Sequence, residues 1–164
     1  MNDLILTPFS MKHSTFSQPL PDDRISEIAF GFNPHNLELP GGYDIMPELS
    51  AAGLWTTPSD LAKLGIEIMK AYKNESAYLQ KDTAVLMTTK AYENSPHGIG
   101  FKVGQGKNGL TFGHSGQNDG FISNMSFCHD GTGIVVMINS NIGDDIPFEV
   151  TDAFMEIYDW QCDT

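Results

Sequence analysis

The residues with the clearest chemical potential lie together at Gly113-His114-Ser115-Gly116. A histidine beside a hydroxyl, on a strand whose glycines let another backbone approach closely, can line a reaction cleft. The same residues also fit an ordinary surface strand, which is the more frequent role of a lone His-Ser-Gly step. The motif alone makes His114 and Ser115 candidates without fixing a reaction.

Two common kinds of catalytic site do not fit these residues. The nucleophile elbow of an α/β-hydrolase needs Gly-x-Ser-x-Gly, and Gln117 stands where that motif requires its second glycine. The five histidines show neither i, i+4 pairing nor a nearby carboxylate pattern typical of a metal site. We therefore expect no metal and no cofactor.

The strand that carries His114 belongs to a meander that we predict from Gly98 onward. Its first three strands are predicted at residues 99–103, 110–115 and 121–128. Turn residues fill 104–109, and Asp130-Gly131 is a strong hairpin signal. The unbroken apolar run at 134–138 predicts a central strand that is covered on both faces.

Helices precede and follow this meander. Apolar residues at helical spacing predict a helix over Pro58–Tyr72, with Thr57 as its N-cap and Asp60 in the place of a capping-box acid. A shorter helix is predicted over 81–89. A final helix is predicted over 147–160, with Asp144 or Asp145 as its cap. Its expected buried stripe consists of Val150, Phe154, Ile157 and Tyr158.

The first 50 residues are rich in Pro, Asn, Gly and Asp. They predict a short helix at 4–6, one strand at 28–32 and otherwise irregular structure. The fold class is therefore α+β, an antiparallel meander flanked by helices in a single domain over 1–164. Residues 1–97 form its irregular and helical region, and 98–164 form the meander with the C-terminal helix.

Composition excludes several partners. The net charge is 9 − 21 = −12, which argues against nucleic acid and anionic membrane surfaces. No apolar run reaches the roughly 18–20 residues that a membrane span requires. Residues 1–9 do not resemble a secretory signal, so the compartment stays unknown.

Cys128 and Cys162 are predicted as unpaired thiols, with a bridge as the less favoured alternative.

Four segments, in order, resemble the family of class C β-lactamases, penicillin-binding proteins and D-alanyl-D-alanine peptidases. Residues 7–15 are similar to its "PLGM…T" segment, and residues 50–61 (SAAGLWTTPSDL) look like another segment found throughout it. Residues 97–101 resemble its Gly-x-Gly-aromatic strand. Residues 113–116 match the His-x-Gly variant of its Lys-Thr-Gly motif. The resemblance implies a β-lactamase/transpeptidase-like fold that is incomplete at its N-terminal end.

In that family, the serine of a Ser-x-x-Lys motif attacks a carbonyl and forms an acyl-enzyme, while the lysine and a Tyr-x-Asn tyrosine manage the proton. No serine of this chain has lysine at the third position after it. We therefore expect the nucleophile in sequence that precedes Met1, and expect this chain alone to be inactive. Tyr92-Glu93-Asn94 spells Tyr-x-Asn but lies at the wrong place in the order, so Tyr92 is predicted to be a loop residue.

The resemblance also assigns roles at the motif. His114 would tune electrostatics and proton flow, and Ser115 would bind the substrate carbonyl or carboxylate. Gly116 completes the motif, and the backbone N–H of Gln117 would be an oxyanion donor. Histidine in place of lysine favours peptidase or esterase relatives over a strict β-lactamase. The alternative is a non-catalytic binding or regulatory module derived from the same fold.

The resemblance implies an unusual sheet edge. In that family, two strands from the N-terminal part pair beside the last meander strand. This chain contains no such strands, so residues 134–138 would lie at an open edge that invites pairing. We predict a homodimer or higher assembly through this edge, unless residues 1–6 fold back over it. A small-molecule or peptide substrate is expected only together with the missing N-terminal part.

Overall fold

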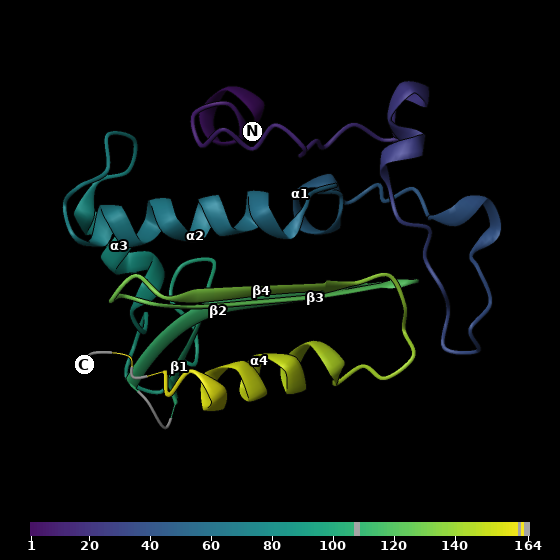
Figure 1. The fold of residues 1–164 in the computed structure, drawn as a ribbon. Coiled ribbons are helices and arrows are strands. Elements are labelled where there is room, and N and C mark those ends of the chain that lie inside the picture. The colour runs from purple at the N-terminus through teal and green to yellow at the C-terminus, as the bar shows by residue number, and fades with distance from the viewer. Residues whose placement is uncertain (107–108, 161, 163–164) are drawn as a thin grey trace.

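A four-stranded antiparallel sheet lies between two helical layers (Figure 1). The computed structural model describes residues 1–106, 109–160 and 162. The strands follow one another in space as they do along the chain. They are β1 (Lys102–Gly106), β2 (Gly109–Asn118), β3 (Phe121–Cys128) and β4 (Gly133–Ile138). The predicted α+β meander flanked by helices is confirmed.

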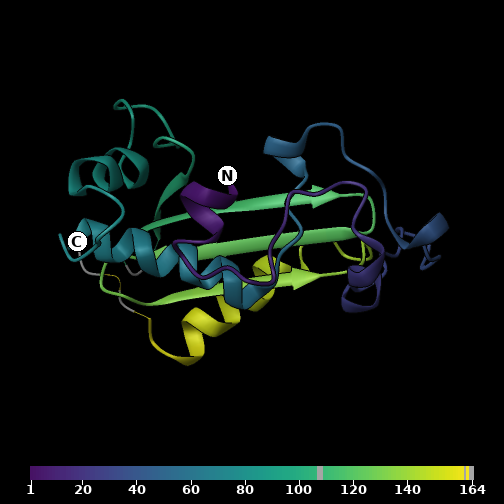
Figure 2. The same ribbon diagram turned by 90° about the horizontal axis from the view of Figure 1, so that it is seen from above.

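Helix α2 runs along one face of the sheet with α3 packed against it, and α4 crosses the opposite face (Figures 1 and 2). The α-helices of the described residues are α1 (Leu49–Ala52), α2 (Pro58–Tyr72), α3 (Lys81–Thr88) and α4 (Ile146–Ile157). The predicted bounds of α2 are confirmed. Its N-cap is confirmed too, because the Thr57 hydroxyl accepts a hydrogen bond from the Asp60 N–H at 3.2 Å. None of the described helices is both long and apolar enough to cross a membrane.

The main core lies between α2 and the sheet and is rich in aromatic side chains. Phe112 of β2 stacks on Phe127 of β3 with ring centroids 5.6 Å apart, and Phe101 packs edge-on against Phe112. Ile68 of α2 is buried in the same cluster. Gly65 lets the helix approach the sheet, because a Cβ there would lie 2.2 Å from Cζ of Phe127.

The N-terminal region packs against the outer side of α2. A π-helical turn over Asn2–Leu6 places Leu6 in a cluster with Phe9, Met11 and the partly buried Leu61 of α2. This segment therefore does not fold back over β4. Two 3₁₀ turns follow, at Asp22–Glu27 and Pro40–Gly42.

The prediction of a strand at residues 28–32 is wrong. Only Phe32 takes part in isolated bridges, to Glu38 and to Ser140. Ala29 and Phe30 are exposed in a loop, and Gly31 donates its N–H to the Gly42 carbonyl instead of to a ladder.

The first and last strands also differ from prediction. β1 begins at Lys102, because Gly100 turns the chain with a φ of 84° and His97 bridges to Lys102. Part of the predicted 104–109 turn is strand, and residues 107–108 lie outside the described residues. β4 is an edge strand of the described sheet, as the family resemblance implies, and not the central strand that its apolar run predicts. Its apolar residues are nevertheless covered on both faces of the strand, because α2 packs on one face and α4 on the other.

The buried face of α4 differs from the predicted stripe. Pro147 and Thr151 are its buried residues, and Asn124 of β3 donates to the Thr151 hydroxyl at 3.0 Å. Ile157 and Tyr158, expected in the core, are 77% and 68% exposed, and Val150 is also exposed. Asp145 is the N-cap residue but makes no side-chain cap bond. Asn124 lies on the face of β3 that packs against α4, and its side chain bonds a hydroxyl. The spacing of apolar residues in α4 does not reveal that Thr151 is the residue placed there.

Cys128 and Cys162 form a disulfide, so the prediction of unpaired thiols is wrong. α4 returns the chain to the end of β3 and brings the two Cα atoms within 5.4 Å, a separation suited to a bridge. Both cysteines are buried with Trp160, and Phe154 packs against them. The two cysteines are 34 positions apart in the chain, so the sequence alone does not reveal that they are close.

Candidate active-site wall

The last part of β2 has an open edge. β1 pairs with β2 only as far as Gly113, which lies opposite Lys102. From His114 to Asn118, β2 pairs with β3 alone, and among the described strands none pairs with its other edge. Backbone N–H and C=O groups on this edge are therefore available to an extended chain.

All four residues singled out from the sequence lie on this open part of β2. His114, Ser115, Gly116 and Gln117 are all exposed. The strand was predicted to end at Ser115, but it continues to Asn118, so Gly116 and Gln117 are strand residues. The candidate motif is thus neither packed inside the protein nor placed on a helix.

The side chains of His114 and Ser115 leave opposite faces of β2, because successive residues on a strand alternate. His114 pairs across the ladder with Met125, which packs in the core on the α2 side. Ser115 pairs with Asn124, whose side chain reaches α4. Among the described residues, no hydrogen bond reaches the side chain of either one. The two therefore do not form a nucleophile–base pair with each other.

Gly113 sets the spacing of β2 and β3 immediately before the motif. A Cβ at this position would lie 2.1 Å from the carbonyl oxygen of Met125. Only glycine permits this approach without moving one of the strands. The close backbone contact expected of the glycines around His114 therefore exists, although it is made within the sheet.

Two asparagines that sequence reasoning missed fix the end of this edge. Asn118 donates its side-chain N–H to the Ala52 carbonyl at 3.1 Å. Asn141 donates to the Asn118 carbonyl at 3.1 Å and accepts the Gly120 N–H. The β2–β3 turn is thereby tied both to α1 and to the segment after β4. Asn118 before Asp119-Gly120 is a turn signal, but its distant partners have no local signature.

Aromatic side chains cover the sheet beside this turn. Trp55 packs edge-on between Tyr43 and Phe121, with ring centroids 5.1 Å and 6.0 Å away. Trp55 also forms two backbone hydrogen bonds with Thr15, each 2.9 Å long. Trp55 therefore packs among aromatic rings, and it links the N-terminal region to the start of β3.

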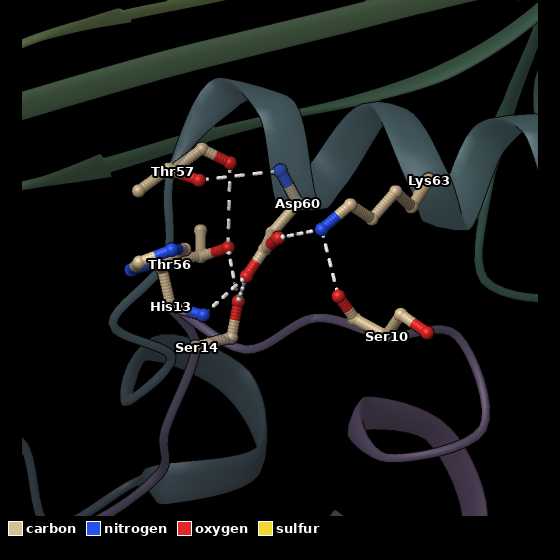
Figure 3. Close-up of polar contacts among 7 residues, drawn as sticks. All are labelled: Ser10, His13, Ser14, Thr56, Thr57, Asp60 and Lys63. Carbon is tan, nitrogen blue, oxygen red and sulfur yellow. Dashed lines mark hydrogen bonds and ion pairs between the residues drawn. The ribbon is translucent and has the colours of Figure 1, made fainter.

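A buried carboxylate holds together the two N-terminal segments that carry the family resemblance (Figure 3). Asp60 of α2 is fully buried and accepts hydrogen bonds from the His13 N–H at 2.8 Å and the Ser14 hydroxyl at 2.9 Å. Lys63 lies 2.6 Å from Asp60 Oδ1 and also donates to the Ser10 carbonyl at 2.7 Å. The carboxylate thus bonds residues 13–14 and not the N-cap backbone, as a capping box would require.

Opposing effects act on the pKa of Asp60. Burial raises this pKa, but hydrogen bonds from Lys63, Ser14 and the His13 N–H, together with the Lys63 charge, outweigh burial. The net result is a pKa below the ordinary value of 3.8, so the carboxylate stays ionised. Its saturated contacts indicate a structural role.

His129 and Tyr92 contribute no chemistry to the β2 edge. His129 is buried, stacks on Tyr72 with ring centroids 3.9 Å apart, and its Nε2 lies 2.9 Å from the Thr88 hydroxyl. Thr88 donates its own proton to the Ala84 carbonyl, so Nε2 is the donor to Thr88. Burial lowers the pKa of His129, only partly opposed by Asp130. Tyr92 lies in an exposed loop, as predicted.

Metal chemistry finds no support at this edge. Within the described ranges, no group of three or more His, Cys, Asp or Glu side chains is placed to hold a metal ion. The β2 edge can instead contribute backbone hydrogen bonds, an imidazole and a hydroxyl.

The sequence matches the Beta-lactamase family over residues 1–154. No curated protein matches it. Among solved structures, it is similar to a class C beta-lactamase, with 16% identity and a TM-score of 0.74 over 99% of this chain and 51% of that one. It is also similar to a D-amino acid amidase from Ochrobactrum anthropi SV3, with 18% identity and a TM-score of 0.71 over 96% and 49% of the two chains.

A third similar structure is an octameric penicillin-binding protein homologue from Pyrococcus abyssi. It is 18% identical, with a TM-score of 0.72 over 98% of this chain and 37% of that one. At such identities the likeness is one of fold. The chain spans about half the length, or less, of these three solved relatives.

Proposed function

The chain belongs to the beta-lactamase family, and on that premise we propose that its β2 edge is one wall of a serine acyl-transfer site. The observation that carries this proposal is the open, exposed edge from His114 to Gln117. The Gln117 N–H serves as an oxyanion donor, a contact whose loss can cost about 3–4 kcal/mol in the barrier. His114 tunes the local field, and Ser115 binds the substrate carbonyl or carboxylate.

The attacking serine comes from polypeptide outside residues 1–164 in this proposal. No serine of the chain is followed by lysine at the third position, so the family's nucleophile motif has no match here. The Ser115 hydroxyl also has no base beside it, since His114 leaves the other face of the strand. The chain alone therefore does not hydrolyse acyl substrates.

Several related acyl compounds are candidate substrates. Structures similar to this chain include a D-amino acid amidase, a D-stereospecific amidohydrolase and a class C beta-lactamase. Histidine at the first motif position favours amides, peptides or esters over β-lactams. All of these present a carbonyl that becomes an oxyanion in the transition state.

A non-catalytic module is the second candidate, and the missing Ser-x-x-Lys motif favours it. The coding sequence upstream of the Met1 codon distinguishes the enzyme from the non-catalytic module. An in-frame Ser-x-x-Lys there supports the enzyme, and a stop codon with a separate ribosome site supports the module.

Kinetics of the joined protein test the proposed wall. If an upstream segment with Ser-x-x-Lys exists, this chain can be produced as one polypeptide with it, here called the joined protein. His114→Ala in the joined protein is expected to lower kcat at least tenfold. His97→Ala, in the exposed loop before β1, is the matched control and should leave kcat unchanged. Equal kcat values for the two variants would refute the role of His114.

Assembly through residues 134–138 stays a prediction. One relative is described as octameric, and that description applies to that protein. In this chain β4 lies at the sheet edge, which supports pairing there without fixing the partner.

A further inference from the structure

The short helix α1 has little packing of its own. None of its four residues is buried, and its N-cap residue Glu48 makes no side-chain cap bond. A single helical turn is not stable in water by itself, because forming it fixes several residues for very few hydrogen bonds. Hydrogen bonds from other segments must therefore determine where α1 lies.

The side chain of Gln18 bonds the chain on both sides of α1. Its Nε2 donates to the carbonyl of Gly53, the residue directly after α1, at 3.1 Å. Its Oε1 accepts the N–H of Met46, shortly before α1. These partners lie 35 and 28 residues away in sequence. One amide thus joins both ends of the α1 turn to a distant segment.

These two contacts select glutamine in particular. The Met46 N–H needs an acceptor and the Gly53 carbonyl needs a donor, and a primary amide supplies both without a charge. A glutamate would lack the donor, and an apolar side chain would lack both groups. Gly53 permits the close approach, because a Cβ there would lie 2.8 Å from Gln18 Nε2.

The segment that carries Gln18 is itself held against α2. The Asp60 carboxylate of α2 accepts hydrogen bonds from residues 13–14 (Figure 3). The next residue, Thr15, pairs with Trp55 through two backbone hydrogen bonds. Gln18 follows three positions later. The long helix α2 therefore fixes α1 through this segment, in place of packing by α1 itself.

α1 in turn contacts the end of the open β2 edge. The Ala52 carbonyl of α1 accepts a hydrogen bond from the Asn118 side chain at 3.1 Å. Asn118 directly follows Gln117, whose N–H is the proposed oxyanion donor. Such a donor acts only when it is held within about 0.5 Å of its productive place. A shift of α1 would reach this donor through one hydrogen bond and one peptide unit.

We propose that Gln18 is a positioning residue that sets the place of α1 and, through Ala52 and Asn118, the place of the β2 edge. Gln18 acts only through these residues and does not touch substrate. Its link to Asn118 is a property of this chain alone. The catalytic use of that link rests on the proposed function.

Nuclear magnetic resonance on the intact chain tests the link. Gln18→Leu removes both hydrogen bonds without adding charge. The Asn118 side-chain amide resonances should then move toward the values of a free amide, and exchange at the Gly53 N–H should accelerate about tenfold. Gln80→Leu is the matched control, because exposed Gln80 precedes α3 and makes no side-chain cap bond. Unmoved Asn118 resonances in folded Gln18→Leu would overturn the proposal.

A second variant separates hydrogen bonding from packing, and it carries the test if Gln18→Leu does not fold. Gln18→Glu keeps the acceptor and the shape but loses the donor, so at pH 7 the Asn118 resonances should again move. Below the ordinary carboxyl pKa of about 4.3, the protonated acid can donate to the Gly53 carbonyl. The resonances should then return to those of the parent chain at the same pH. No return on acidification would contradict the donor role.

Kinetics of the joined protein test the catalytic consequence. Gln18→Leu should lower kcat about fivefold and leave KM within about twofold, because the oxyanion contact forms in the transition state. Gln80→Leu should change neither. If His114→Ala lowers kcat and Gln18→Leu does not, Gln18 has no positioning role, although the wall stands. If neither lowers kcat while the Asn118 resonances move, the proposed wall fails and the link from Gln18 stands.

Discussion

The side-chain N–H of Asn118 donates to the carbonyl oxygen of Ala52 at 3.1 Å, across 66 residues of sequence. This bond anchors the open end of β2 to α1. Asn141 adds a second hydrogen bond to the Asn118 carbonyl. The edge proposed to face substrate is therefore held at its far end by hydrogen bonds to α1 and to the segment after β4.

Asn118→Ala should loosen this edge without unfolding the chain. We expect a loss of about 1 kcal/mol in the free energy of unfolding, the usual net worth of such a hydrogen bond. Amide exchange should accelerate at Gln117 and Gly120 and stay unchanged in α2. Asn94→Ala, in an exposed turn, is the control. Unchanged exchange at Gln117 would show that the clamp does not hold the edge.

Removing the buried carboxylate should cost far more. Asp60→Ala leaves the Ser14 hydroxyl and the His13 N–H without their acceptor and Lys63 without its counter-ion. We expect a loss of about 3 kcal/mol in the free energy of unfolding. Urea titration measures it, with Asp23→Ala as an exposed control expected to stay within about 0.5 kcal/mol. Matching midpoints for both variants would contradict the network in Figure 3.

Acid should destabilise the fold through His129 first. Burial holds the pKa of folded His129 below the ordinary 6.5, so the unfolded chain binds its proton at higher pH. The contribution of neutral His129 is complete above about pH 6.5 and declines as pH falls toward the lowered folded pKa. Asp60, whose pKa is also lowered, loses its contribution only below its ordinary 3.8.

The variant His129→Gln isolates the first effect. The free energy of unfolding is measured by urea titration from pH 7.5 to 5. His129→Gln should show a shallower fall below pH 6.5 than the parent chain, and His35→Gln, at an exposed turn, should keep the parent slope. Parallel curves for all three chains would contradict the burial of a neutral His129.

Much of the fold follows from local sequence because its determinants are local. Thr57-Pro58 and the apolar spacing after it specify α2, and Asp130-Gly131 specifies the β3–β4 hairpin. The exposed strand position of His114 could be predicted in the same way. The family was predicted from four short segments that resemble it and that occur along the chain in the family's order.

The errors share a non-local cause. The pairing of Cys128 with Cys162 and the contact of Thr151 with Asn124 both depend on where α4 crosses the sheet. The edge position of β4 depends on which strands are present, while its apolar run reports only that helices cover both faces. Asp60 was assigned by its local spacing, yet His13 and Ser14, which donate to its carboxylate, lie 47 and 46 residues away in sequence.

Reduction of the disulfide should weaken the C-terminal region. A bridge across 34 residues contributes about 4 kcal/mol in the chain-entropy estimate, so dithiothreitol should lower the free energy of unfolding by up to that amount. Thiol titration of the unfolded, unreduced chain should find no free cysteine. Cys162→Ser is the control, since reductant should not change its stability further. Two titrating thiols in the untreated protein would refute the bridge.

The most direct test of the proposed wall is covalent labelling followed by intact-mass measurement. The chain is treated with fluorescent penicillin or a fluorophosphonate, alone and joined to a segment that supplies Ser-x-x-Lys. We predict no adduct on the chain alone, and one adduct per molecule at the supplied serine in the joined protein. A stoichiometric adduct on any serine of residues 1–164, or no adduct on the joined protein, would contradict the account.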